Sequence, residues 1–343
     1  MNYAFFLGAG ASKTCHAPLQ GEMLKEYFAE RRTNRRNNRF VDSDVDTFLF
    51  QFFGLDVDKQ PASFPTFEEI LGVLDLAIMR KEAFPNFENG HQNLGDSDRL
   101  SACRDRFVGL MAIILRDKLR NTINNHEDLI SRLKRKNSLT RCSFFSTNYD
   151  ILIDNALLRK NCIMDYGFQC QTEHHNAVKL YKLHGSLNWL YCPSCKEISV
   201  THLEKAAAEY YDPKEPHTLI CLNCESIRRP VIVPPTYFKD FSNFLLSMVW
   251  HNAEKTLKDV DKIFFCGYSF PDADIQIKYL LKRAEIIRRN RPLKIVIANN
   301  HDNKSNEEKE SEKSRYERFF RHGSVEYTEE SFQSLMDNIE QYL

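Results

Sequence analysis

Four cysteines stand in two Cys-x-x-Cys pairs, one at Cys192 and Cys195 and the other at Cys221 and Cys224. Thiolates are preferred ligands of zinc, and four of them close a tetrahedral shell that leaves no position for catalysis. The alternatives are four free thiols or a redox-active pair, but neither explains why the pair occurs twice. The spacing therefore predicts a structural Zn²⁺ site within a small zinc-ribbon module over residues 190–228.

Two short polar segments carry residue types suited to acid–base chemistry. Asn148 and Asp150 follow an apolar run, and an amide and a carboxylate two residues apart can orient a ribose and its leaving group. The alternative is an Asx-type turn that caps the next helix. His184 also follows an apolar run. An imidazole that titrates near neutral pH can act as a general base toward a hydroxyl, and the alternative is a structural histidine.

Gly8 and Gly10 directly follow the apolar run 3–7. Such a turn suits a pyrophosphate, because glycine lets the backbone approach the ligand and the next helix offers its positive N-terminus. The third glycine of the dinucleotide-binding fingerprint is missing, and Ser12 stands nearby. A plain strand-to-helix turn is therefore the alternative.

These polar segments need elements that bring them together. An apolar run typical of a buried strand precedes each of them, and two similar runs occur later in the chain. The predicted strands cover residues 3–7, 142–147, 178–183, 262–266 and 294–298. Strands that alternate with helices favour a Rossmann-like α/β fold with a parallel sheet, in which ligands bind beyond the carboxyl ends of the strands. We therefore expect all five polar turns to meet at one crevice.

Residues 25–140 are predicted as a mainly helical insertion into this fold. Apolar residues recur there at helical spacing, as at Phe67, Ile70 and Leu74. Within the insertion, residues 84–98 are rich in Pro, Asn and Gly and are predicted as a surface loop.

The 343 residues include 47 Lys and Arg and 47 Asp and Glu, which leaves a formal net charge of zero. Bulk electrostatic binding of nucleic acid needs a positive surplus and is therefore excluded. Arg31–Arg39 can still contact nucleic-acid phosphate or an acidic partner, and the alternative, which also applies to Lys282–Arg291, is a solvated face. Residues 302–318, dense in Glu, Lys and Ser, are predicted as a solvated loop or helix face.

The chain shows no sign of a membrane or secreted location. No apolar run is long enough for a membrane span, and the N-terminus lacks the basic region of a secretory signal. The six cysteines outside the two pairs are scattered singly, as expected of reduced thiols. The sequence thus predicts a cytoplasmic protein without a membrane partner.

Taken together, these segments resemble the sirtuin (SIR2-like) family, in which they occur in the same order. The matching segments are Gly8–Ser12, Ser146–Asp150, Leu183–Gly185, the double Cys-x-x-Cys, Gly267–Ser269 and Asn299. The resemblance implies one NAD-binding domain over residues 1–343 that includes the helical insertion and the zinc ribbon. It implies an NAD site lined by Gly8, Ala9, Gly10, Ser12, Gly267, Ser269 and Asn299. It also implies that Asn148 and Asp150 hold the nicotinamide ribose and that His184 is the catalytic histidine.

Two departures separate the chain from the sirtuin deacylases. Those enzymes carry a Gly-Ile-Pro-Asp-Phe-Arg type segment soon after the glycine turn, where residues 15–20 here read Cys-His-Ala-Pro-Leu-Gln. Their acyl-lysine clamp, a Phe-Gly-Glu type strand after the ribbon, is replaced by residues 231–239. The Thr147–Asp150 segment, the Pro-Pro-Thr sequence, and Gly267–Ser269 ahead of Asp274 are instead similar to bacterial SIR2-like NADases of antiphage systems.

That similarity implies an NAD⁺ hydrolase that releases ADP-ribose and nicotinamide and depletes NAD in antiphage defence. It further implies a homo-oligomer, a separately encoded activator protein, or both. The alternatives are an NAD-dependent protein-lysine deacylase and a non-enzymatic sensor subunit for NAD or ADP-ribose.

Overall fold

The computed structural model of the chain describes residues 1–33, 43–56, 59, 63–82, 84, 96–119, 123–168, 176–201, 220–234, 244–288, 291–299, 304–328 and 330–343. The chain forms two compact units. The first comprises Met1–Ala17, Thr122–Ser186 and Lys239–Leu343, and the second comprises Pro18–Asn121 and Leu187–Phe238. The predicted domain boundaries, with an insertion over 25–140 and a ribbon over 190–228, remain predictions.

A seven-stranded sheet forms the core of the first unit. All five predicted strands belong to it, namely β1 (Tyr3–Leu7), β2 (Cys142–Ser146), β4 (Val178–Lys182), β8 (Lys262–Cys266) and β9 (Lys294–Ala298). Their aromatic residues stack across neighbouring strands, with the Phe5 ring 5.6 Å from Phe144 and 4.8 Å from Phe264. Such rings on a sheet covered on both faces account for the unbroken apolar runs in the sequence.

Two short edge strands, β3 (Met164–Asp165) and β10 (Ser324–Tyr327), complete the sheet. Both are only partly buried. Neither strand has an apolar run, and for that reason neither was predicted from the sequence. β2 and β4 each end one residue before the predicted end.

The strand order is β10-β9-β8-β1-β2-β4-β3, with parallel pairing throughout. The chain builds outward from β1 on one side and then returns to β8 on the other side of β1, which is the topological switch of a doubly wound fold. Leu7 pairs in register with Ser146 and Cys266. These two residues in turn pair with Lys182 and Ala298. All five strands therefore end at one edge, and the predicted parallel Rossmann-like α/β fold is confirmed.

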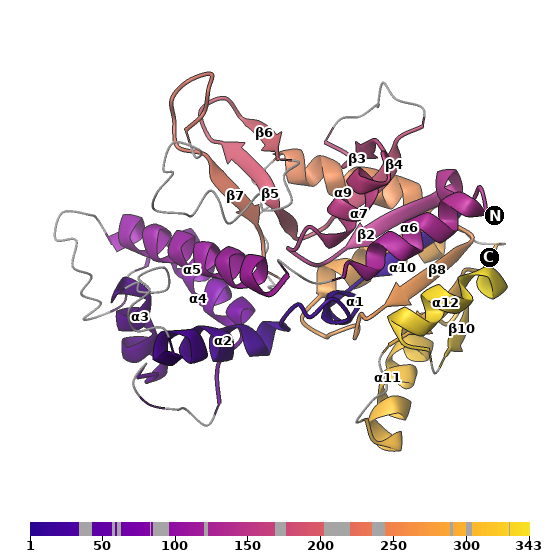
Figure 1. Ribbon diagram of the computed structural model, residues 1–343, viewed down its shortest axis with the longest axis horizontal. Coiled ribbons are helices and arrows are strands. Elements are labelled where there is room, and N and C mark those ends of the chain that lie inside the picture. Colours follow the sequence, from indigo (N-terminus) through magenta and orange to yellow (C-terminus); the bar gives the residue numbers. More distant parts are fainter. Residues whose placement is uncertain are drawn as a thin grey trace. The chain divides into compact units, whose positions relative to one another are not determined.

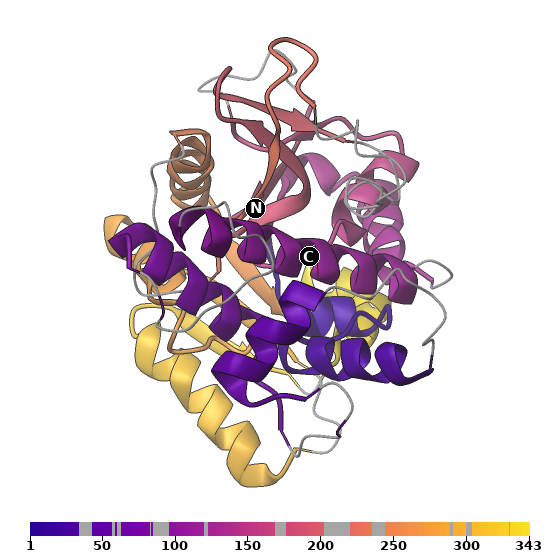
Figure 2. The ribbon, with the colours of Figure 1, turned by 90° about the vertical axis from the view of Figure 1, so that its left-hand side faces the viewer.

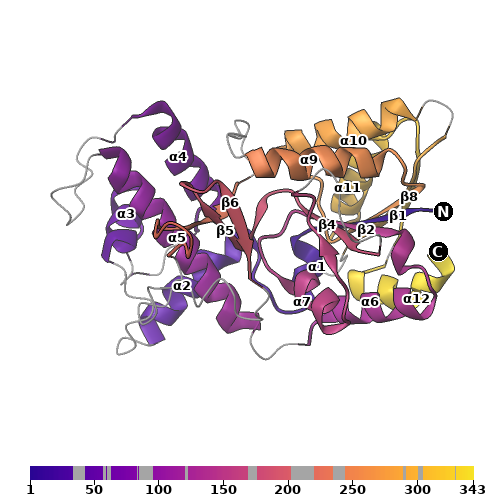
Figure 3. The ribbon, with the colours of Figure 1, turned by 90° about the horizontal axis from the view of Figure 1, so that it is seen from above.

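Helices cover both faces of this sheet (Figure 3). One face carries α9 (Phe244–Leu257), α10 (Ile275–Ile287) and α11 (Asn306–Phe319). The other face carries α1 (Ala9–Lys13), α6 (Asn125–Arg135), α7 (Leu152–Arg159) and α12 (Phe332–Tyr342). A short 3₁₀ turn, Leu139–Arg141, leads into β2. The result is a three-layer arrangement.

The second unit contains four helices that pack side by side (Figures 1 and 2, indigo to purple). They are α2 (Gln20–Thr33), α3 (Ser43–Phe53), α4 (Phe67–Arg80) and α5 (Asp96–Leu119). In α4, Phe67, Ile70 and Leu74 are buried, as their spacing predicts. Most of the predicted loop 84–98 lies outside the described residues, but its last part is wrong because α5 begins at Asp96.

The second unit also contains a three-stranded sheet. It consists of β5 (Gly185–Cys192, whose first two residues belong to the first unit), β6 (Glu197–Val200) and β7 (Arg229–Ile232), in the order β6-β5-β7. The antiparallel β5–β6 pair brings Cys192 opposite Glu197 at the start of the ribbon segment.

The charged segments are less solvated than predicted. Residues 306–319 form α11, in which Glu312 and Tyr316 are buried, so the prediction of a solvated face is wrong for them. Arg288 is also buried, and its guanidinium donates to the carbonyl of Lys258 (3.0 Å). Arg31 pairs with Asp46, whereas Arg35, Arg36 and Arg39 lie outside the described residues. In the part of the chain that the structure describes, no helix is long and apolar enough to cross a membrane.

Candidate functional site

Asn148 and Asp150 lie in the turn after β2 and are tied to the turn after β1. The Asn148 amide donates to the Gly8 carbonyl (2.9 Å) and to the Ser12 hydroxyl (2.9 Å). The Ser12 hydroxyl donates to Asp150 Oδ2 (2.7 Å), and Asp150 Oδ1 accepts from the backbone N–H of Leu152 (3.1 Å). Asp150 therefore accepts from the first N–H of α7 although the N-cap position itself is Ile151, and both of its oxygens have protein donors. Asn148 is the half-exposed member of this network.

The turns after β1 and β8 pack backbone against backbone. Gly8 N–H donates to Cys266 O (3.0 Å), and Gly10 N–H donates to Gly267 O (2.8 Å). A Cβ on Gly8 would lie 2.5 Å from Gly267 O, and a Cβ on Gly10 would lie 2.8 Å from Gly267 Cα. Contact between the two turns therefore requires these glycines even without a ligand. The helix that follows, α1, has only five residues.

His184 follows β4 at the same sheet edge and is 1% exposed. Its Nε2 lies 3.1 Å from Asp274 Oδ1, and its ring centre lies 6.3 Å from that of Tyr149. The Trp250 indole donates to the carbonyl of Leu183 (3.0 Å) and so fixes the backbone just before it. The imidazole is thus held in a low-dielectric setting beside a carboxylate.

Asn299 and Ser269 follow β9 and β8. The Asn299 amide donates to Tyr268 O (3.1 Å) and to Glu312. These two bonds orient Oδ1 of Asn299 away from both acceptors. That oxygen is buried without a hydrogen bond among the described residues. Ser269 is exposed. The structure therefore gathers the predicted residues of the first unit at one sheet edge, whereas their roles toward a ligand remain predictions.

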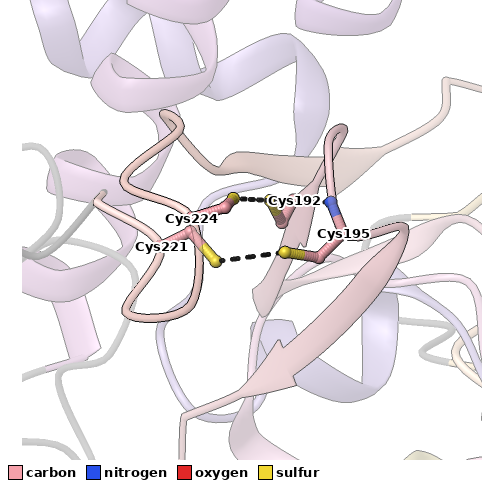
Figure 4. A group of neighbouring side chains, drawn as sticks. All are labelled: Cys192, Cys195, Cys221 and Cys224. Atoms are coloured by element: carbon pink, nitrogen blue, oxygen red, sulfur yellow. Dashed lines mark hydrogen bonds between the residues drawn. The ribbon is translucent and has the colours of Figure 1, made fainter.

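The four paired cysteines lie together in the second unit (Figure 4). Their sulfur atoms all lie within 4.8 Å of one another, with Cys192 and Cys224 3.5 Å apart and Cys195 and Cys221 3.9 Å apart. A tetrahedral zinc with Zn–S bonds of about 2.3 Å needs S···S edges of about 3.8 Å. The donor set and its spacing therefore fit zinc.

Proton sharing within the cluster also suits a metal. In the metal-free cluster, a hydrogen bond from the Ser226 side chain lowers the pKa of Cys224 to about 6. The hydrogen bond between Cys195 and Cys224 raises the pKa of Cys195. A bound metal would displace the remaining protons, since thiolates are the ligands. The nine cysteines among the described residues form no disulfide, which leaves the four thiols available.

We expect the purified protein to contain about one zinc per chain. Cys192→Ser or Cys221→Ser removes one of four ligands, so the zinc content should fall to near zero and the second unit should melt at a lower temperature. Metal analysis and thermal unfolding measure both effects. Cys162→Ser, which changes a half-buried thiol of the first unit, should keep the metal. If the wild type contains no metal and either cysteine variant is as stable as the wild type, the zinc site is contradicted.

Comparison with known proteins identifies the family. A family model described as SIR2-like domain matches residues 142–319, just over half of the chain. The chain belongs to the SIR2-like family. A mutant Sir2 homologue in complex with ADP-ribose is 16% identical, with a TM-score of 0.47 over 99% of this chain and 91% of that one. A Sir2 complex with a p53 peptide and NAD⁺ is 14% identical, with a TM-score of 0.42 over 99% and 92%. No curated protein matches the chain.

In this SIR2-like chain, a buried cation that was not predicted from the sequence, Lys182, lies at the end of β4. Its ammonium group donates to the carbonyl of Asp150 and to Asp154 Oδ2 (3.3 Å), whose other oxygen accepts from the Tyr166 hydroxyl (2.6 Å). Lys182 is fully buried at the last position of β4. The available signal was a lysine at the last position of a buried strand, two residues after Leu180 and on the face opposite the exposed Lys179. A charge there must find a partner inside the fold.

His126, on α6, is a second missed group. It is 1% exposed, its ring lies 5.1 Å from that of Phe332, and burial lowers the pKa of its imidazole to about 4. In the unfolded chain a histidine has a pKa of about 6.5. Below pH 6.5, His126 binds a proton in the unfolded chain but not in the folded protein. The native state is therefore fully stable above pH 6.5 and loses stability as the pH falls toward 4.

When the pH falls from 7 to 5, His126 should lower the free energy of unfolding by about 2 kcal/mol. Urea unfolding of the wild type and of His126→Gln at both values measures this contribution. Other titrating groups are common to both proteins, so the difference between the two pH dependences isolates His126. His251→Gln, which changes an exposed histidine on α9, should keep the wild-type dependence. Equal pH dependence in wild type and His126→Gln would contradict the assignment.

Proposed function

We propose that this SIR2-like protein is an NAD⁺ hydrolase that cleaves the bond between nicotinamide and ribose. The observation that carries the proposal is the placing of an amide (Asn148), an imidazole (His184) and two glycine turns on adjacent parallel strand ends. These ends flank the topological switch of the sheet, where doubly wound folds bind nucleotides.

On the binding side, the proposal assigns the NAD contacts to the turns after β1, β8 and β9. The assigned residues are Gly8, Ala9, Gly10, Ser12, Gly267, Ser269 and Asn299. The N–H of Gly10 is already bonded to Gly267 O, so the exposed positions, Ala9 and Ser269, are the ones we expect to face the pyrophosphate. The buried Oδ1 of Asn299 suits a ribose hydroxyl, which can donate to it.

On the chemical side, cleavage builds positive charge on the ribose C1′ as nicotinamide leaves with the bonding electron pair. A preorganised amide and a nearby carboxylate stabilise that charge. In the proposal, Asn148 orients the ribose and the attacking water. Both oxygens of Asp150 are occupied by Ser12 and Leu152, so Asp150 acts through its charge and by fixing Asn148 through the Ser12 hydroxyl. His184 accepts the proton that water gives up.

Water is favoured over an acyl-lysine oxygen by the segment at the position of the deacylase clamp. Val231 and Ile232 are buried in β7, which pairs with β5, and the Ile232 carbonyl accepts from Arg104 (2.6 Å). A clamp strand needs unpaired backbone groups to bind an extended peptide. The rest of the replaced segment, from residue 235 to 239, lies outside the described residues.

The biological part of the proposal is NAD depletion in bacterial antiphage defence, in the cytoplasm. An uncontrolled NADase would harm its own cell, so control by homo-oligomerisation or by a separately encoded activator protein belongs to the proposal. Zinc in the ribbon is structural in this scheme, because four thiolates leave no site for water.

The test is to incubate the purified protein with NAD⁺, with and without an acetyl-lysine peptide, over a range of protein concentrations, and to separate the products by chromatography. Equimolar nicotinamide and ADP-ribose without peptide supports the hydrolase. Turnover that requires the peptide, with loss of its acetyl group, assigns the chain to the deacylases instead. Tight NAD binding without turnover at any protein concentration favours the sensor subunit.

A further inference from the structure

Asp274 stands at the start of α10, but its side chain does not cap that helix by a hydrogen bond. As the N-cap residue it has the side chain that normally accepts a hydrogen bond from the first helical turn, yet it makes no such bond. The helix therefore lacks the stabilisation that such a bond normally gives. An aspartate that forgoes this bond is expected to have another partner.

That partner is His184. Asp274 Oδ1 lies 3.1 Å from His184 Nε2, and Asp274 Oδ2 accepts from the Tyr268 hydroxyl (2.9 Å). His184, Asp274 and Tyr268 are 1%, 3% and 4% exposed. The triad comes from the ends of β4 and β8 and the start of α10 within the first unit, so the sheet and the helix fix its geometry together.

The Asp274 side chain lies between the N-terminus of α10 and a hydroxyl donor. The positive end of the α10 dipole and the Tyr268 hydroxyl both stabilise a carboxylate at this position. Other charged groups on the surrounding elements have their own partners: Lys182 on β4 binds Asp154, Asp150 binds Ser12, and Lys278 on α10 binds Asp272. Among the described residues, Asp274 is therefore a carboxylate within ion-pair distance of His184 Nε2 (3.1 Å).

We propose that Asp274, held by Tyr268, is the positioning residue of His184: it keeps the proton on Nε2 and leaves Nδ1 as the base. The catalytic meaning of the pair rests on the proposed NAD⁺ hydrolase function. A buried carboxylate beside the catalytic imidazole fixes its tautomer and stabilises the imidazolium that forms.

The C1′–N bond breaks and its electron pair goes to nicotinamide, while an oxygen of water forms a bond to C1′. The water proton goes to His184 Nδ1, and the resulting imidazolium shares its charge with Asp274 until the proton leaves for solvent. The products are nicotinamide, ADP-ribose and one proton, with no other reactant.

Asp274→Asn keeps the shape of the side chain but removes its charge. We expect kcat for NAD cleavage at pH 8 to fall at least about 100-fold with KM for NAD changed less than about 3-fold, because the tautomer and not the binding is affected. The acid limb of the pH–rate profile should move to lower pH. In Tyr268→Phe, kcat should fall about 10-fold, because Asp274 loses the hydrogen bond that holds it. Tyr181→Phe, which removes a buried hydroxyl bonded to Thr256, is the matched control and should keep wild-type kinetics.

A second measurement is independent of turnover. In protein labelled with ¹⁵N-histidine, the His184 signals, identified by their absence from His184→Ala, should show a proton on Nε2 in the wild type and mixed tautomers in Asp274→Asn. If the wild type does not cleave NAD, the hydrolase function fails while this spectrum still tests the pair. If Asp274→Asn does not fold, Tyr268→Phe carries both measurements. Unchanged kcat and an unchanged His184 tautomer in the folded variants would overturn the proposal.

Discussion

His184→Ala is expected to cleave NAD at least about 100-fold more slowly than the wild type, because removal of a general base typically costs two to four orders of magnitude in rate. KM for NAD should change little, since the imidazole is 1% exposed and acts on the proton and not on the dinucleotide. Steady-state kinetics with product separation measures both constants. Thermal unfolding of the same variant checks that loss of the Asp274 contact has not disturbed the fold.

Asn148 has both a structural role and a proposed chemical role, which a control variant can distinguish. Asn148→Ala loses the bonds to Gly8 O and to the Ser12 hydroxyl, so we expect lower stability together with a fall in kcat of similar size to that of His184→Ala. Asn252→Ala on α9 is the matched control. It also removes a side-chain hydrogen bond to a backbone carbonyl, that of Gly167. A stable His184→Ala protein with wild-type kcat would exclude His184 from the chemistry and with it the proposed mechanism.

The sheet and the edge at which its polar turns meet could be predicted because they depend on local signals. Five apolar runs, each followed by a polar turn, gave five parallel strands, of which β1, β8 and β9 have the predicted bounds. The spacing of the paired cysteines likewise predicts the cluster that they form. In each case the residues that form the feature are either adjacent in sequence or repeated at a fixed interval.

The partners of the site residues could not be predicted in the same way. Asp274 meets His184 across 90 positions of sequence, and the amide of Asn299 meets Glu312 on a helix that looks solvated from its composition. Lys182 is buried although its residue type is usually exposed. Each of these contacts depends on which strand ends lie next to each other, and that order becomes known only when the sheet is formed.

The glycines illustrate how a residue predicted to bind a ligand can also be required by packing. Gly8 and Gly10 were predicted as the place where a pyrophosphate approaches the backbone. The structure shows that the turn after β8 fills the space beside them, with the Gly10 N–H bonded to Gly267 O (2.8 Å). Packing of the two turns and binding of a dinucleotide are therefore separate demands on the same residues, and they predict different results for a substitution.

Gly267→Ala is expected to destabilise the protein by roughly 4 kcal/mol or to prevent folding. Gly267 has a φ of +61°, and a Cβ there would lie 2.0 Å from Ala11 N and 2.3 Å from Gly10 C. Both contacts are with backbone, so neither can be relieved by a side-chain rotation. The two turns would have to separate and would lose the bonds that join them at this edge of the sheet. Urea unfolding measures the loss.

Gly54→Ala separates the steric part from the conformational part. Gly54 has a nearly identical φ of +63° but no atom within 4 Å of the added Cβ, so its substitution should cost only about 1 kcal/mol. The excess cost at Gly267 then measures the close approach of the two turns. If Gly267→Ala instead folds with wild-type stability and loses only NAD binding, the glycine serves the ligand alone, and backbone packing of the two turns is not what requires it.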